Sequence, residues 1–290
     1  MVEKRPLGRT GLMVSPVMFG GIINTDETQE SADRYVAKAV SAGVNYFDVA
    51  PSYGNAEVRL APSLTRIRDD VILACKTTER SADGARRELL ASLDVLGAKY
   101  FDVYQLHALA KDVDLDTAFA PGGAMETVLW AKKEGLVRHI GFSTHNENVA
   151  LRALDLYDFE TVLFPMNWAM GLTVGWGDRI AQAAVDKGFG LLCMKTLVHR
   201  KWLPGEERAF PKSWCKPLWE EKRLAVCGMK YGFLKGGVTM VPPGNIKHFE
   251  FALDHVEECL SNPLTQEEMA FMQDEAEKVR EHLIFDVTKM

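Results

Sequence analysis

Four polar side chains with complementary chemistry stand at or just after three apolar segments of the chain. They are a carboxylic acid, a phenol, an amine and an imidazole, contributed by Asp48, Tyr53, Lys76 and His107. Each taken alone has an ordinary structural explanation, such as a helix cap, a surface cation or a buried core histidine. Groups of these types exchange protons and shift one another's pKa when they lie together. The set therefore predicts acid–base chemistry if the fold brings the four side chains to one place.

The elements that must position these residues alternate between apolar strands and amphipathic helices. Strands are expected at residues 17–20, 44–48, 71–74, 101–106, 139–142, 161–164, 190–194 and 238–241. Helices are expected at residues 28–42, 83–96, 125–134, 149–156, 179–187, 223–233 and 249–259. Strands that are continuously apolar and separated by helices indicate a parallel sheet covered by helices.

About eight strand-then-helix units favour a (β/α)8 TIM barrel over a doubly wound open sheet. No strand is followed by the G-x-G-x-x-G phosphate loop that is typical of the open sheet. Residues 5–15 predict an N-terminal β-hairpin with its turn at 8–11, and residues 266–282 predict a charged outer helix with a solvated face. We expect residues 1–290 to form a single barrel domain, with its active site at the C-terminal ends of the strands.

The composition of the chain argues against several classes of binding partner. The formal net charge of -6 argues against a nucleic-acid partner, which would need a basic surface. The five cysteines are odd in number and show no C-x-x-C spacing, so we expect neither a disulfide framework nor a metal site. No signal-peptide pattern and no run of about 18 apolar residues is present, which predicts a cytoplasmic protein with no membrane partner. The oligomeric state is left open.

Three longer motifs carry a resemblance to a known family. They are residues 43–54 (GVNYFDVAPSYG), residues 92–107 (SLDVLGAKYFDVYQLH) and residues 135–143 (GLVRHIGFS). Together with the turn at 7–11 they resemble the aldo-keto reductase family, in the order in which that family has them. The resemblance extends from the hairpin to about the last strand. It implies a (β/α)8 barrel that uses NADP(H) or NAD(H) to interconvert small aldehydes or ketones and alcohols.

The resemblance also implies a role for each of the four side chains. Tyr53 would be the general acid and base for the carbonyl oxygen, and Lys76 would lower the pKa of its phenol from the usual value of about 10. Asp48 would orient Lys76, while His107 would hydrogen-bond the substrate oxygen. Hydride chemistry would belong to the cofactor.

Cofactor contacts are implied at further positions, where this chain departs from the family pattern. The candidates are Gly20, Gly21, Ser143, Thr144, Asn167, Met194, Lys195, Gly244, Asn245 and Lys247. Thr144 stands where the family often has asparagine, and Met194 where an aromatic ring often stacks on the nicotinamide. In residues 241–249, proline stands at the place of the lysine, and phenylalanine at that of the arginine, that often bind the 2′-phosphate of NADPH in this family. Lys247 and His248 are the nearby side chains able to add positive charge.

Two other functions stay open at this point. One is a nicotinamide-binding sensor or subunit with little turnover, and the other is a barrel lyase or isomerase that shares the strand-end residues. The loops at residues 108–124 and 198–219 are long enough to form walls around the barrel mouth. The tryptophans of the second half are expected mostly to pack these loops. The sequence names neither the physiological substrate nor the favoured direction of reaction.

Overall fold

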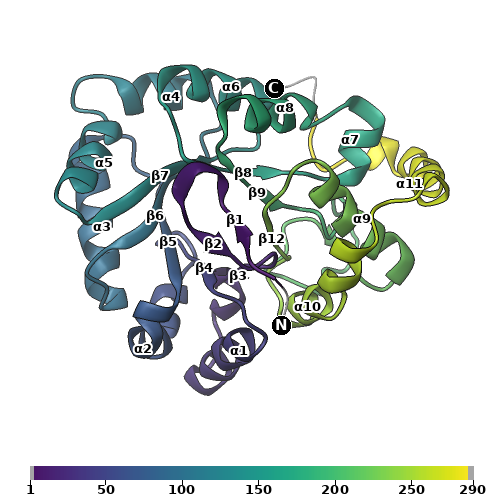
Figure 1. Cartoon of the computed structure of the whole chain (residues 1–290), viewed down its shortest axis with the longest axis horizontal. Helices are drawn as coiled ribbons and strands as arrows, with labels where there is room; N and C mark the ends of the chain where they lie inside the picture. Colours follow the sequence, from purple (N-terminus) through teal and green to yellow (C-terminus); the bar gives the residue numbers. More distant parts are fainter. Residues whose placement is uncertain (1–2, 287–290) are drawn as a thin grey trace.

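The computed structural model describes residues 3–286, and its centre is an eight-stranded sheet with parallel neighbours. A parallel bridge between Val17 and Met240 joins the two edges of the sheet, so it closes into a barrel (Figure 1). The predicted (β/α)8 barrel is thus confirmed. Its strands, in order around the sheet, are β3 (Phe19–Gly20), β4 (Tyr46–Asp48), β5 (Ile72–Thr77), β6 (Phe101–Leu106), β7 (Val137–Ser143), β8 (Thr161–Pro165), β9 (Gly190–Met194) and β12 (Thr239–Val241).

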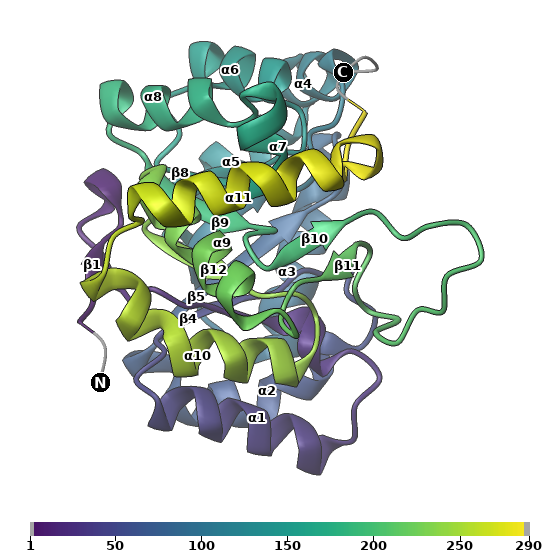
Figure 2. The ribbon, with the colours of Figure 1, turned by 90° about the vertical axis from the view of Figure 1, so that its right-hand side faces the viewer.

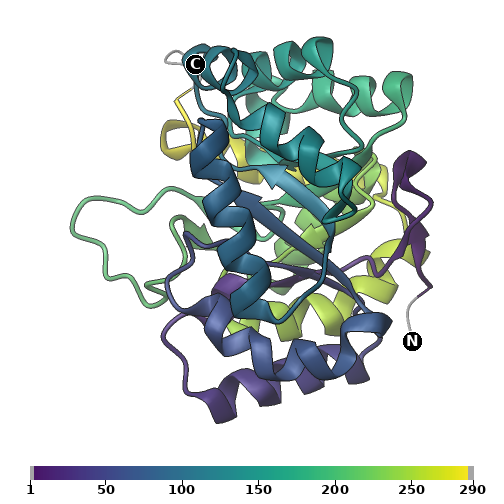
Figure 3. The same ribbon diagram turned by 90° about the vertical axis from the view of Figure 1, so that its left-hand side faces the viewer.

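Helices surround the barrel on its outside (Figures 1 and 3). The signals that predicted their ends act as expected. Thr28 caps α1 by accepting a hydrogen bond from the Ser31 amide at 3.2 Å, and Gly97 ends α3 at a positive φ of 60°. The helices are α1 (Gln29–Ser41), α2 (Ala56–Ile67), α3 (Ala82–Leu96), α4 (Asp112–Phe119), α5 (Ala124–Lys133), α6 (Glu147–Leu156), α7 (Trp168–Val174), α8 (Asp178–Lys187), α9 (Lys222–Leu234), α10 (Ile246–Ser261) and α11 (Gln266–Lys278).

Three of these helices were not predicted. Helix α2 contains Pro62, which normally ends a helix, yet it forms because Leu60 and Leu64 are buried against the barrel. Helices α4 and α7 span 8 and 7 residues, too few to show a clear periodicity. Helix α11 forms where a charged outer helix was expected; Met272 and Ala276 are buried on one of its faces, and most of its other residues are exposed or half-buried.

The N-terminal hairpin closes one end of the barrel. Its strands are β1 (Arg5–Pro6) and β2 (Met13–Val14), which pair antiparallel as predicted. Leu7 and Val14 are fully buried and pack with Tyr46 and Leu192 inside the barrel. Gly8 has a positive φ of 51°, and a Cβ on it would lie 2.3 Å from the amide nitrogen of Gly190. Only glycine lets the hairpin approach the barrel so closely.

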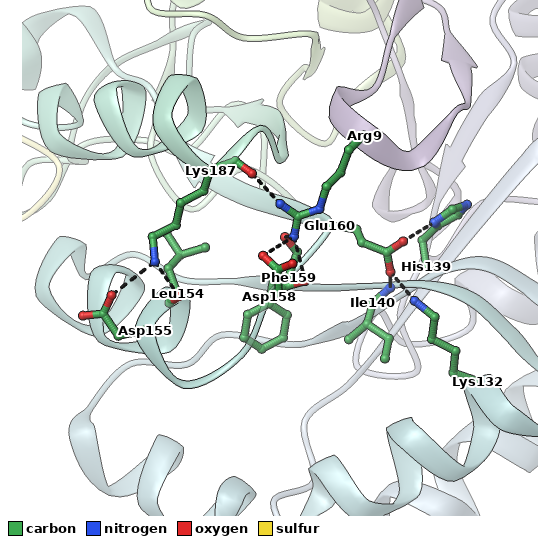
Figure 4. A network of polar contacts seen from close by, with 10 residues as sticks. All are labelled: Arg9, Lys132, His139, Ile140, Leu154, Asp155, Asp158, Phe159, Glu160 and Lys187. Atoms are coloured by element: carbon green, nitrogen blue, oxygen red, sulfur yellow. Dashed lines mark hydrogen bonds and ion pairs between the residues drawn. The ribbon is translucent and has the colours of Figure 1, made fainter.

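A polar network ties the hairpin to the strand ends (Figure 4). The Arg9 guanidinium donates to the backbone oxygens of Asp158 and Phe159 at 2.8 and 2.9 Å, and also to that of Lys187. Beside it, Glu160 accepts hydrogen bonds from Lys132 at 2.6 Å and from a backbone amide of β7 at 3.0 Å. This end of the barrel is therefore filled and fixed, which leaves the opposite end for a site.

Two findings concern the membrane span and the metal site that were considered from the composition. Within residues 3–286, no helix combines the length and the apolar character needed to cross a bilayer. In the same part of the chain, no three His, Cys, Asp or Glu side chains are grouped so as to hold a metal ion.

Candidate active site

Two of the four side chains form a buried ion pair at the C-terminal end of the barrel. Asp48 is the last residue of β4, and Lys76 lies inside the neighbouring strand β5. The Lys76 Nζ is 2.5 Å from Asp48 Oδ2 and 3.1 Å from the backbone oxygen of Val49. Lys76 is fully buried, so Asp48 supplies the compensating charge that such a cation requires.

Tyr53 and His107 complete the cluster. The Lys76 Nζ lies 5.0 Å from the centroid of the Tyr53 ring. The ring centroids of Tyr53 and His107 are 5.7 Å apart in an edge-to-face arrangement. Ser52 Oγ lies 3.3 Å from His107 Nδ1. The structure therefore brings the four sequence-predicted side chains into one contiguous group.

Burial and the neighbouring charges shift the pKa values of Lys76 and Tyr53 in opposite directions. Burial lowers the pKa of Lys76, but the attraction of Asp48 and Tyr53 outweighs it, so the pKa of Lys76 is raised and the amine is charged. Burial raises the pKa of the Tyr53 phenol by more than Lys76 lowers it. The expected net lowering of the Tyr53 pKa is therefore wrong, although Lys76 acts in the expected direction. Sequence spacing identified the cation but not the burial of the phenol.

His107 is neutral in this environment. Burial lowers the pKa of its imidazole to about 3, and the charge of Lys76 adds to the effect. At neutral pH the ring therefore carries one N–H and one unprotonated nitrogen, and it is able to donate one hydrogen bond without carrying a charge.

The chain just after His107 is held from two sides. The Arg80 guanidinium donates to the backbone oxygens of His107 at 2.7 Å and Ala108 at 3.2 Å. Ser143 Oγ accepts a hydrogen bond from the Ala108 amide at 2.9 Å. Ala108 has a positive φ of 52°, which is unfavourable for alanine. These contacts fix the backbone that carries His107, and Arg80 was not singled out from the sequence.

A cavity lies beside Asp48 and Tyr53 at this end of the barrel. It holds about 680 Å³ of empty space, including the part that is open to solvent. One wall is the long loop between β10 (Val198–Arg200) and β11 (Lys216–Pro217), here called the strap, residues 201–215. Figure 2 shows the strap and the N-terminal hairpin at opposite ends of the molecule. The lining residues are Gly20, Ile22, Asp48, Tyr53, Leu163, Met194, Lys195, Val198, Lys212, Ser213, Trp214, Cys215, Val241, Pro242, Pro243 and Gly244.

The strap is attached across the mouth of the cavity. Lys212 Nζ donates to the backbone oxygen of Ile23 at 2.9 Å and to Glu27 at 2.7 Å. Trp202 Nε1 donates to the backbone oxygen of Ser213 at 2.8 Å. The length of the loop predicted a wall here, but nothing in the sequence indicated which of its residues face the cavity.

Fold and motif agree with a match to a family model. The model described as Aldo/keto reductase family matches residues 16–211, which is more than half of the chain. The chain belongs to the aldo/keto reductase family. Members of this family are oxidoreductases that act on carbonyl compounds with NAD(P)H, and the suspected resemblance is confirmed.

Individual aldo/keto reductases and related enzymes are similar over part of the chain. An L-galactose dehydrogenase of Arabidopsis thaliana is 31% identical over 160 residues, which cover 49% of this chain and 48% of that protein. A 6-dehydroglucose reductase of Novosphingobium aromaticivorans is 31% identical over 123 residues, covering 36% of this chain and 40% of that protein. The chain thus spans about half, or less, of the length of these relatives.

Solved structures of aldo/keto reductases share the fold over nearly the whole chain. The holo form of an aldo-keto reductase from Bacillus halodurans superposes with a TM-score of 0.74 at 22% identity, covering 95% of this chain and 96% of that one. A putative aldo-keto reductase from Pseudomonas superposes with a TM-score of 0.70 at 23% identity, covering 89% and 95%. At such identities the likeness supports the fold alone.

The cofactor residues implied by the aldo/keto reductase pattern divide into two groups. Four of them line the cavity: Gly20, Met194, Lys195 and Gly244. The other six lie outside its lining: Gly21, Ser143, Thr144, Asn167, Asn245 and Lys247.

Thr144 and Asn167 are engaged in holding the backbone. Thr144 Oγ1 donates to the backbone oxygen of Leu109. The Asn167 amide donates to the backbone oxygens of Lys195 at 3.1 Å and Val198 at 2.8 Å, and its oxygen caps α7. Both side chains are buried.

The residues around the start of α10 also differ from expectation. Asn245 Oδ1 accepts a hydrogen bond from the Lys247 amide at 3.0 Å and so caps the helix. His248 is fully buried against Phe210, and burial lowers its pKa to about 4. A neutral, enclosed imidazole supplies no positive charge to a phosphate group. Lys247 is exposed and is the remaining candidate cation of this run.

Proposed function

We propose that this protein is an NAD(P)H-dependent oxidoreductase that reduces an aldehyde or ketone to an alcohol, or catalyses the reverse reaction. The observation that carries the proposal is the buried Lys76–Asp48 pair beneath the Tyr53 ring, next to the cavity and to His107. Membership of the aldo/keto reductase family supports the same reaction class.

The cavity is compatible with a nicotinamide cofactor. Gly20 and Gly244 present backbone without side chains there, and Met194 offers an apolar surface. A bound nicotinamide would supply the hydride, whereas the chain supplies binding, orientation and proton transfer.

Tyr53 is the proposed proton donor to the carbonyl oxygen of the substrate. Its side chain is partly buried at the cavity, and with its raised pKa the phenol is protonated at neutral pH, as a general acid must be. Lys76 stabilises the phenolate that is left after transfer, and Asp48 holds Lys76 in place. The neutral His107 donates a hydrogen bond to the same oxygen and stabilises the charge that develops on it.

A panel of carbonyl compounds, followed by the absorbance of the reduced cofactor, tests this proposal. The panel should include sugars, because one partial relative is named an L-galactose dehydrogenase and another a 6-dehydroglucose reductase. We expect turnover of at least one aldehyde or ketone. Cofactor binding without turnover would favour a sensor instead, and absence of cofactor binding would favour another class of barrel enzyme.

Arg80 provides a prediction about the positioning of His107. We expect Arg80→Met to lower kcat/KM for a carbonyl substrate by about ten- to a hundredfold, because small misplacements of a catalytic group have effects of this size. Cofactor affinity, measured by fluorescence titration, should not change. Arg86→Met is the matched control, since Arg86 packs on Trp130 on the outer helices. Wild-type kcat/KM in a folded Arg80→Met protein would contradict the positioning role.

Cofactor choice provides a second prediction. Residues 241–249 contain no arginine, so this run offers no bidentate fork for a 2′-phosphate. The buried His248 adds no charge, and Lys247 is a single exposed cation. We therefore expect NADPH to be preferred over NADH by less than about 1.4 kcal/mol, or tenfold.

Titration of each reduced cofactor against tryptophan fluorescence at low and moderate salt measures this preference. Trp214 lines the cavity and serves as the reporter. The residual preference should disappear in Lys247→Met. A hundredfold preference for NADPH that vanishes at high salt would show that the phosphate-binding residues lie elsewhere.

A further inference from the structure

The charged side chains on the cavity wall are paired with one exception. Lys212 is neutralised by Glu27, and Asp48 pairs with Lys76. Lys195 also lines the cavity, but within residues 3–286 it forms no ion pair with a carboxylate. Among the described residues, the cavity therefore carries one positive charge that no carboxylate compensates.

The surroundings of the Lys195 ammonium are largely apolar and aromatic. Its Nζ lies 4.0 Å from Cys215 Sγ, 5.7 Å from the centroid of the Trp214 ring and 5.8 Å from that of Phe285. Burial lowers the pKa of this amine. The aromatic faces attract the cation weakly, but removing it from water without a counter-ion is unfavourable. Such an arrangement makes an anionic ligand the missing partner.

The backbone of Lys195 is also in an unfavourable conformation. Its φ is +65°, in the left-handed region that glycine or asparagine adopts more easily. Asn167, which is buried, holds this conformation by donating to the Lys195 backbone oxygen at 3.1 Å. Two independent features that disfavour folding thus meet at one residue on the cavity wall, which is typical of binding sites.

Neighbouring side chains connect the surroundings of Lys195 with His145. The His145 ring stacks on Phe285 with centroids 5.1 Å apart, and its Nε2 lies 3.3 Å from Met194 Sδ. The charge of Lys195 affects the titration of His145, which in turn affects that of His107. An anion on Lys195 would thus share the region in which His107 is proposed to bind the carbonyl oxygen.

We propose that Lys195 binds a carboxylate carried by the carbonyl substrate, so that the enzyme prefers anionic aldehydes or ketones. This inference rests on the proposed function. The diphosphate of the cofactor is the other possible source of an anion. The position of Lys195 beside His145 and Phe285 favours the substrate, and the experiment separates the two sources.

Matched pairs of aldehydes test the substrate class. The pairs are 3- and 4-carboxybenzaldehyde and their methyl esters, which differ in charge but little in shape. We expect wild-type kcat/KM for the better acid to exceed that of its ester by about 10- to 100-fold, the range that one charge-assisted hydrogen bond supplies. Lys195→Met should remove this preference, so that the kcat/KM values for acid and ester become equal within about twofold. Lys195→Arg should retain most of it, and Lys133→Met, on the exposed face of α5, controls for net charge.

A binding measurement tests the proposed anion site at Lys195 without requiring turnover. The corresponding 3- and 4-carboxybenzyl alcohols, titrated with oxidised cofactor present, should quench tryptophan fluorescence in the wild type and bind at least about tenfold more weakly to Lys195→Met. If the alcohols bind in this way but no aldehyde is turned over, the proposed function fails while the anion site stands. Equal wild-type rates on acid and ester, or equal losses on both in Lys195→Met, would overturn the inference. Weaker cofactor binding by Lys195→Met in the absence of substrate, with the acid preference intact, would assign Lys195 to the cofactor instead.

Discussion

Tyr53→Phe is expected to reduce the rate of carbonyl reduction by at least about 10²–10⁴-fold, the usual contribution of general acid catalysis. The change removes one hydroxyl and leaves an aromatic ring that still packs beside Lys76 and His107. The fold and the cofactor affinity should therefore survive. Steady-state kinetics with a saturating reduced cofactor and fluorescence titration of that cofactor measure the two effects separately.

A second tyrosine provides the control. Tyr35 lies on α1 against Arg34, on the outside of the barrel, and Tyr35→Phe should retain wild-type rates. If Tyr53→Phe turned over substrate at the wild-type rate, Tyr53 would not be the acid. A loss of cofactor binding equal to the loss of rate would instead assign Tyr53 a binding role.

Lys76→Met is expected to reduce alcohol oxidation by about a hundredfold or more and to move its pH profile to more alkaline values. Oxidation needs the Tyr53 phenolate, so its rate rises with pH through the pKa of the phenol. Burial already raises that pKa, and Lys76 opposes the rise. Removal of the cation should therefore raise the pKa of Tyr53 further.

Variants of Asp48 separate the catalytic effect of losing the Lys76 charge from its effect on folding stability. Lys76→Met leaves the buried Asp48 without a partner, which costs about 3–5 kcal/mol of folding free energy in comparable cases. The double variant Asp48→Asn/Lys76→Met removes both charges and should recover thermal stability without recovering activity. Asp48→Asn alone should lower the rate less than Lys76→Met, because Lys76 keeps its charge. An unchanged position and height of the pH profile in Lys76→Met would show that Lys76 does not tune Tyr53.

The sequence predicted the features that depend on local pattern. Strands β6 and β9 were predicted with the bounds that the structure shows, because continuous apolar runs between turn residues are unambiguous there. The convergence of Asp48, Lys76 and His107 followed from topology alone, since the C-terminal ends of parallel strands meet at one mouth. Tyr53 was placed with them by its short distance along the chain from Asp48.

Features that depend on contacts between distant segments could not be predicted. Asn167 was a cofactor candidate because its amide could bind a carboxamide, but it bonds backbone oxygens 28 and 31 residues further along the chain. Helix α2 was missed because Pro62 is a local signal and the burial of its neighbours is not. The raised pKa of Tyr53 arises from burial, which motif spacing does not report.

The surroundings of Lys195 on the cavity wall also depend on contacts between distant segments. Lys195 was a cofactor candidate implied by the family resemblance, but its aromatic neighbours come from the strap and from Phe285, 90 residues further on. Only the folded chain brings these segments together, and only there is the missing counter-ion apparent. The chemistry at strand ends is thus easier to predict than the specificity created by loops.

Transfer of an isotope label tests the central claim most directly. A reduced nicotinamide cofactor carrying deuterium at C4 is incubated with the protein and the best aldehyde of the panel, and the product alcohol is analysed by mass spectrometry and NMR. We expect deuterium on the carbinol carbon of the product, at a rate that Tyr53→Phe greatly reduces. An alcohol free of deuterium after use of both C4-labelled epimers, or no alcohol at all from any carbonyl compound that binds, would contradict the assignment of this site to carbonyl reduction.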